Sequence, residues 1–109
     1  MRDNIKGGAL TETTFLILLA TCAPIHGYGI MQFVERETRG RVTLGAGTLY
    51  GAINTLQKKG WIEPFGNSAK DVKKDYIITR LGKRAAADEQ KRLADISHLA
   101  EKVLEGICI

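Results

Sequence analysis

The stretch from residue 43 to residue 63, TLGAGTLYGAINTLQKKGWIE, constrains the fold more than any other part of the chain. On a helix of 3.6 residues per turn, Leu49, Ile53 and Leu56 fall on one side, which must be buried in a core. The opposite side is small, polar and basic at its end. It holds two glycines, each of which weakens a helix by roughly 1 kcal/mol relative to alanine.

Glycine in a helix is most useful where another molecule comes close to the backbone. The polar side of this helix therefore suits a DNA major groove, and a solvated surface helix is the alternative interpretation. The candidate DNA contacts on it are Gly47, Thr48, Tyr50, Gly51, Asn54 and Lys58.

Two further helices are predicted ahead of this one. The first covers about 12–22, with a cap at Thr11 and a stop at Pro24. The residues expected to face the core on it are Phe15, Leu16, Leu18 and Leu19. The second runs from about 27 to 38 and ends at Arg39-Gly40. At its start we expect His26 to serve capping or packing, and the Tyr28 hydroxyl either to reach a phosphate or to pack.

A hairpin is predicted after the third helix. Val42 and Leu44 indicate a short strand before that helix, which stops at Gly60. Residues 61–65 and 72–79 then have the pattern of two strands, joined by a turn-rich loop. The lysines around this loop are Lys70, Lys73 and Lys74. They make the hairpin a candidate phosphate-binding element, and an ordinary hairpin with a solvated tip is the alternative.

From Arg80 the sequence is helical almost to its end. Apolar residues follow a 3-4-3-4 spacing that is typical of paired helices. They are Leu93, Ile96, Ala100, Val103 and Ile107, and Leu99 widens the stripe. About 25 residues of helix span roughly 38 Å, more than one side of a small body can cover. We therefore expect a homodimer through this helix. Folding back onto the first helix is the alternative.

Composition narrows the class of protein. A chain of 109 residues with a net charge of +4 predicts one domain and leans towards a polyanionic partner. Residues 54–84 hold eight Lys or Arg against three acidic residues, whereas residues 85–109 hold three against five. No segment is long enough to span a membrane, and two cysteines without ligand spacing fit a reducing cytoplasm. No catalytic set, metal cluster or cofactor motif can be assembled, so we expect no enzyme.

Three helices followed by a hairpin is the order of a winged helix-turn-helix domain, a mainly α fold with a two-stranded wing. The chain also resembles the PadR family of bacterial transcriptional regulators between about residues 10 and 86. The matching motifs are His26-Gly27-Tyr28-Gly29, Gly47-Thr48-Leu49-Tyr50, Leu56-x-x-x-Gly60-Trp61-Ile62 and Tyr76-x-x-Thr79-x-x-Gly82.

The resemblance implies a dimeric repressor that binds double-stranded DNA and, in some members, is released by a small aromatic or drug-like effector. Short members that bind flat drugs carry a tryptophan on the dimer helix, whereas residues 80–109 here contain no aromatic residue. We expect residues 1–79 to form the DNA-binding domain with an N-terminal arm, and residues 80–109 the dimerisation helix. The alternatives are a small-molecule sensor or a protein-interaction adaptor on the same scaffold.

Overall fold

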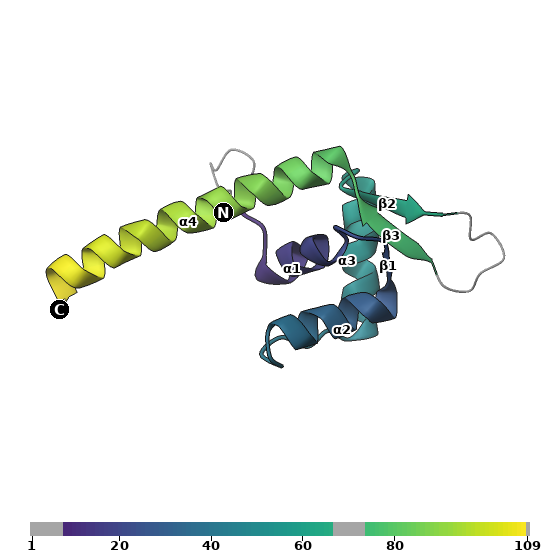
Figure 1. The fold of residues 1–109 in the computed structure, drawn as a ribbon, viewed down its shortest axis with the longest axis horizontal. Helices are drawn as coiled ribbons and strands as arrows, with labels where there is room; N and C mark the ends of the chain where they lie inside the picture. Colours follow the sequence, from purple (N-terminus) through teal and green to yellow (C-terminus); the bar gives the residue numbers. More distant parts are fainter. Residues whose placement is uncertain (1–7, 67–73, 109) are drawn as a thin grey trace.

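A computed structural model describes residues 8–66 and 74–108 of the chain. The elements in order are α1 (Glu12–Ala20), β1 (Ile25–His26), α2 (Gly27–Glu37), α3 (Ala46–Lys58), β2 (Ile62–Phe65), β3 (Asp75–Ile78) and α4 (Arg80–Val103), with a π-helical turn over Leu104–Cys108. They form a winged-helix body from which α4 projects (Figure 1). The radius of gyration is 16.2 Å, whereas a compact chain of this length has about 13 Å.

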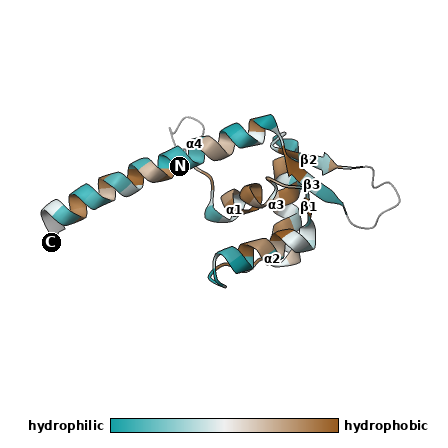
Figure 2. Ribbon diagram, viewed as in Figure 1, coloured by the Kyte–Doolittle hydropathy of each residue, from teal (hydrophilic) through white to brown (hydrophobic). Residues whose placement is uncertain are grey.

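The core lies where α1, α2 and α3 meet the sheet. Leu49, Ile53 and Leu56 are buried in it, as the helical period predicts. The other buried apolar residues are Ile17, Leu18, Ala20, Ile30, Val34, Ile62, Tyr76 and Ile78. Figure 2 shows apolar ribbon gathered inside the body and apolar patches continuing along α4 beyond it. Because α3 is anchored through its apolar side, its polar side is held facing outward.

Local signals account for most helix ends. The Thr11 side chain accepts a hydrogen bond from the Thr14 backbone N–H and caps α1 as predicted. α3 stops at Gly60, whose φ of 77° places it in the left-handed region that glycine adopts without steric cost. α1 ends at Ala20, earlier than expected. The Thr21 hydroxyl there donates to the Leu18 carbonyl, and the Thr21 carbonyl accepts the Ile78 N–H.

The sheet differs from the predicted pair of strands. It has three antiparallel strands in the order β1-β3-β2, with Ile25 opposite Tyr76 and Ile62 opposite Ile78. Val42 and Leu44 are not in a strand, and the missing strand is instead Ile25–His26. A strand of two residues has no period of its own, and it exists here because β3 supplies a partner. The wing itself, β2 and β3, has two strands as expected.

α1 packs differently from the prediction. Ile17 and Leu18 are fully buried, Phe15 and Leu16 are half-buried, and Leu19 is exposed. The helix is apolar on almost every side, so its sequence does not distinguish the side that faces α2 and α3 from the side beside α4. Leu19 lies on the latter and lines a groove with Phe15.

The first turn of α4 packs closely against the backbone at the start of β2. Thr79 caps it by accepting the Gly82 N–H, and the Thr79 hydroxyl donates to the Gly60 carbonyl. A Cβ at Gly82 would lie 2.1 Å from the Trp61 carbonyl oxygen. Glycine at this position therefore lets the first turn of α4 rest on the start of β2. That contact fixes the direction in which α4 leaves the body.

Candidate nucleic-acid interface

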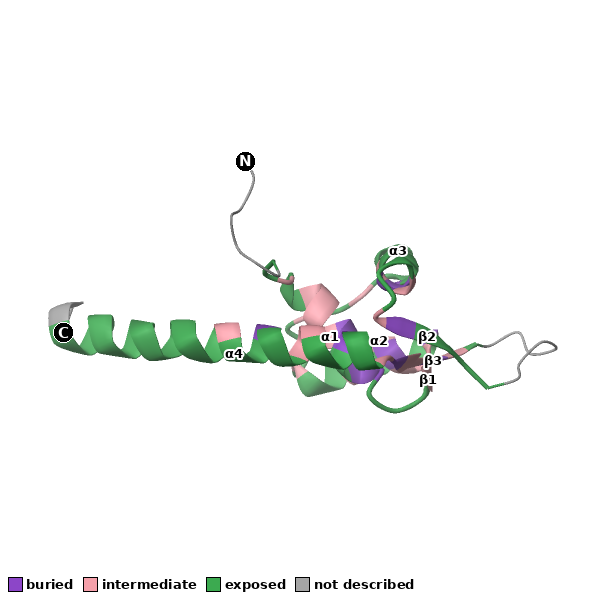
Figure 3. Ribbon diagram, turned by 90° about the horizontal axis from the view of Figure 1, so that it is seen from above, coloured by how far each residue is buried: buried purple, intermediate pink, exposed green. Residues whose placement is uncertain are grey.

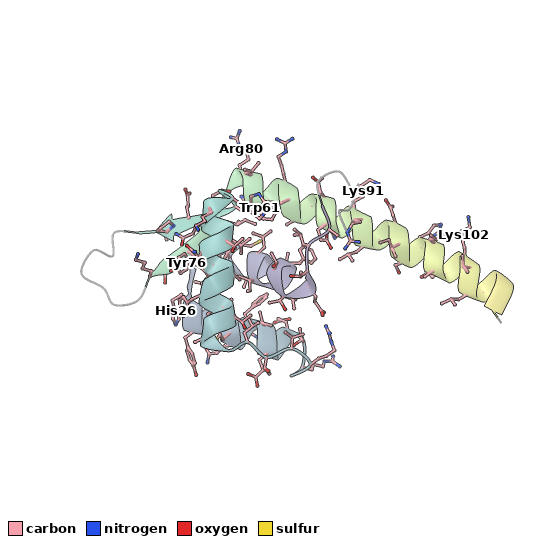
Figure 4. All side chains as sticks on the ribbon, turned by 180° about the vertical axis from the view of Figure 1, so that it is seen from behind. His26, Trp61, Tyr76, Arg80, Lys91 and Lys102 are labelled. Carbon is pink, nitrogen blue, oxygen red and sulfur yellow. The ribbon has the colours of Figure 1, made fainter. Side chains whose placement is uncertain are left out.

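The outward side of α3 is exposed along its length. All six residues predicted on it are exposed, and Lys58 is the one charged residue within Ala46–Lys58. Figure 4 shows α3 in front of the body, and Figure 3 shows it at the rim, free of other described elements on its outer side. A small, uncharged helix surface with a cation at one end can approach the floor of a major groove closely.

No neighbouring group in the described part of the protein occupies the space beside the glycines of α3. A Cβ at Gly47 or Gly51 would meet no atom within 4 Å. The missing side chains are therefore unexplained by internal packing, although each costs helix stability. Both positions remain open to an approaching molecule.

At Gly27, unlike at Gly47 and Gly51, an added side chain would collide with a neighbour. A Cβ there would lie 2.3 Å from the Tyr50 hydroxyl, so Gly27 lets the start of α3 dock on the start of α2. Tyr50 is still 49% exposed, and Tyr28 is 59% exposed. Burial, with a smaller effect from nearby Tyr50, raises the pKa of Tyr76 behind them. The fold thus places two accessible tyrosines, predicted from separate motifs, at the joined starts of α2 and α3.

His26 packs and does not cap. Its side chain makes no cap hydrogen bond to α2, and a Cβ at Gly29 would lie 3.2 Å from its ring. The ring centroid is 6.4 Å from that of Tyr28. Among the described residues, no group of three or more His, Cys, Asp or Glu side chains could hold a metal ion. His26 therefore supports the Tyr28 end of the surface.

The wing contributes one described candidate. Lys74 is exposed immediately before β3, on the hairpin that extends away from α3 in Figure 1. Lys70 and Lys73, predicted with it, lie outside the described residues.

α4 has one continuous face with two environments. In its first half this face packs on the body through Gly82, Ala85, Glu89 and Arg92, and α4 contacts both α1 and β3 there. The same 3-4 spacing carries the face onward through Ile96, Leu99 and Val103, which are exposed by 50%, 57% and 39%. Leu93 and Ala100 beside them are exposed too, and the Ile107 side chain lies outside the described residues. Figure 3 shows the body ending well before the helix does. The first half of α4 does pack on α1, as the folding-back alternative expects, whereas the apolar stripe of the second half is exposed in the single chain.

A groove lies beside this face near the body. It has a volume of about 420 Å³, and its walls come from α1, the first half of α4, Cys22 and Ile78 of β3. The apolar residues lining it include Phe15, Leu19, Ala86 and Ala87.

Residues 15–88 match the PadR-like family of transcriptional regulators. The chain belongs to this family. An uncharacterized protein X of Lysinibacillus sphaericus is 30% identical to it over 109 residues, with 98% of each chain covered.

Solved PadR structures share the fold. A PadR family transcriptional regulator from Eggerthella lenta DSM 2243 superposes with a TM-score of 0.72 at 21% identity, covering 85% of this chain and 81% of that one. A PadR family transcription regulator from Clostridium difficile R20291 gives 0.70 at 21% identity, covering 86% and 99%. The winged-helix architecture with a long C-terminal helix is therefore that of the family. Within the described ranges of this PadR-like chain, no helix is long and apolar enough to cross a membrane.

One feature of this PadR-like protein is not predicted by its sequence. A hollow beside α3 is lined by residues from the start of α1, from α3 and from the turn after it. Its charged residue is Lys59, which lies over the ring of Trp61 at 5.0 Å. In the sequence these two residues flank the glycine that stops α3, and no periodic pattern connects them with α1.

Proposed function

We propose that this PadR-like regulator is a sequence-specific DNA-binding repressor that acts as a homodimer. The observation that carries the proposal is the outward side of α3, where the whole predicted set is exposed and two glycines face open space. These glycines cost helix stability, and the open backbone beside them supports close approach of DNA. Residues 1–79 would then act as the DNA-binding part, and residues 80–109 as the dimerisation helix.

The proposed contacts divide by chemistry. Asn54 and Thr48 are suited to base edges, because amide and hydroxyl groups hydrogen-bond there. Gly47 and Gly51 would let the α3 backbone come close. Contacts that position the protein on phosphates are assigned to Tyr28, Tyr50, Lys58, Lys70, Lys73 and Lys74.

The proposed dimer uses the free half of α4. An exposed apolar face contributes about 25 cal/mol per Å² when it is buried against a second chain. In a two-fold arrangement the same surfaces pair twice, so the distal face of each α4 could lie against the other chain's α4 and the groove beside α1. The proposed interface residues are Leu93, Ile96, Leu99, Ala100, Val103 and Ile107. Two copies of α3 would then read two half-sites at fixed spacing.

The proposal is tested by duplex binding across a salt series. Sites are first mapped on the organism's genomic DNA, and affinity for a mapped site is measured by fluorescence anisotropy. We expect a steep fall with salt, since lysine contacts release counterions. Asn54→Ala should cost roughly 1–3 kcal/mol on the mapped site and less on unrelated DNA. An absence of salt-dependent binding by the wild type would favour the adaptor instead.

A second prediction concerns Gly51. Gly51→Ala should raise the free energy of unfolding by about 1 kcal/mol, because alanine is the better helix former and the new Cβ meets no atom within 4 Å. The same variant should bind the mapped duplex more weakly. Thermal denaturation and anisotropy titration measure the two effects. A stabilised variant with unchanged DNA affinity would show that Gly51 does not face DNA.

A further inference from the structure

The hollow beside α3 lies on the flank opposite Tyr50. Its volume is about 310 Å³, and it is bounded by the start of α1, the second half of α3 and the turn that follows. In Figure 4, Trp61 appears on one side of α3, whereas Tyr76, His26 and the wing appear on the other. The polar residues lining the hollow are Thr11, Thr14, Thr55 and Lys59.

The hollow contains no acid among its described residues, and two of its polar residues, Lys59 and Thr14, keep protons to donate, whereas the Thr11 and Thr55 hydroxyls already donate within the protein. Lys59 is the one ionisable residue among those lining it, and within the described part of the chain no carboxylate lies within ion-pair distance of its ammonium. The Thr14 hydroxyl accepts a hydrogen bond from Thr11, which leaves its own proton to donate. The lining also includes the small residues Gly51 and Ala52. An ammonium and a free hydroxyl proton, with no neighbouring carboxylate among the described residues, favour an anionic ligand.

One wall of the hollow is held by α4. The Leu10 N–H donates to a Glu89 carboxylate oxygen at 3.1 Å, and Arg92 Nε donates to the same oxygen at 3.0 Å. Glu89 is 4% exposed, and hydrogen bonding from Arg92 keeps the pKa of its carboxyl below the usual value. The ionised carboxylate thus fixes the backbone just before α1. The hollow is formed in advance, because its wall need not be ordered by a ligand.

We propose that this hollow seats a backbone phosphate of the DNA strand bordering α3 on the side away from the wing. The inference rests on the proposed function. A helix in the major groove has one sugar-phosphate backbone on each flank. The wing and the tyrosines are placed for one backbone, and Lys59 with Thr14 is placed for the other. Lys59 would make the charged contact, and the Thr14 hydroxyl the neutral one.

The test compares Lys59→Met with Lys91→Met. The first variant removes the ammonium and keeps an unbranched apolar stem over Trp61, and the second makes the same charge change on the exposed part of α4. Affinity is measured over a salt series on the mapped duplex and on an arbitrary duplex. For Lys59→Met we expect equal weakening on both duplexes and a salt slope lower by about one unit. For Lys91→Met we expect the wild-type slope.

Thr14→Val checks the neutral contact. It keeps the side-chain shape and the backbone cap at Thr11 but removes the hydroxyl. We expect a several-fold loss on both duplexes with the salt slope unchanged, since no charge is lost. Far-ultraviolet circular dichroism and the fluorescence of Trp61, the one tryptophan in the chain, verify that each variant is folded.

Failure of this inference is distinguishable from failure of the proposed function. A folded Lys59→Met protein with the wild-type salt slope refutes the phosphate seat. If the wild-type protein binds the mapped duplex in that case, the proposed function still holds. Wild-type protein that binds neither duplex refutes both. A further outcome is that inorganic phosphate alters Trp61 fluorescence in the wild type but not in Lys59→Met, while the two proteins have the same salt slope for DNA binding. In that outcome the hollow binds a free anion, and the assignment to DNA is wrong.

Discussion

Val103→Glu is expected to convert the protein to a monomer and to weaken operator binding by on the order of a hundredfold or more. Val103 lies on the free half of the α4 face and is 39% exposed in the single chain. In a two-fold dimer the substitution occurs twice, so two carboxylates without partners would have to leave water. Loss of the dimer would also remove the simultaneous binding of two half-sites. Light scattering and anisotropy titration measure the two effects.

The matched control is Ala94→Glu. Ala94 is exposed and lies nine residues before Val103, which places it on the opposite side of α4. The same carboxylate there should leave the dimer and its DNA affinity intact. If Val103→Glu remains dimeric with normal operator affinity, the dimer forms through another surface and the assignment of the α4 face is wrong.

Gly82→Ala should lower the free energy of unfolding by about 3 kcal/mol, the upper part of the range for overpacking. The added Cβ would lie 2.1 Å from the Trp61 carbonyl oxygen and 2.8 Å from Ile78 Cγ1. The first of these atoms is backbone, so either β2 or the first turn of α4 has to move. For a chain of this size we expect a melting temperature lower by roughly 10–20 °C. Differential scanning calorimetry measures it.

Gly47→Ala provides the comparison for Gly82→Ala. It makes the same chemical change within a helix, but its Cβ would meet no atom within 4 Å. Its melting temperature should equal or exceed that of the wild type. Equal melting temperatures for Gly82→Ala and the wild type would show that the crossing of α4 over β2 is not the reason for glycine at this position.

The helices were predictable because their signals are local. The Thr11 cap, the Gly60 stop and the period of Leu49, Ile53 and Leu56 each act within one or two turns. The spacing of the α4 stripe likewise predicted an unpartnered face, and the exposure of Ile96 and Val103 agrees with it. The residues proposed for DNA on α3 followed from the same periodicity, since a buried side defines the opposite one.

The errors have a different origin. Ile25–His26 is a strand only because β3 pairs with it, and Val42–Leu44 is not a strand because no partner lies beside it in the three-stranded sheet. Leu19 was expected to be buried, but α1 is apolar on almost every side and its sequence cannot indicate which side meets α2 and α3. These outcomes depend on residues that are distant in the chain.

By itself the sequence determined the four helices, the two wing strands, the buried side of α3 and the apolar stripe of α4, since backbone period and capping depend on neighbouring residues. Only the tertiary structure decided what each glycine is for. Gly27 and Gly82 make room for Tyr50 and Trp61, whereas Gly47 and Gly51 face open space. The tertiary structure also placed Lys59 and Thr14 around one hollow and joined Leu10 to Glu89 by a hydrogen bond. Such contacts are made when separate helices pack, and packing depends on the whole core and not on any single segment.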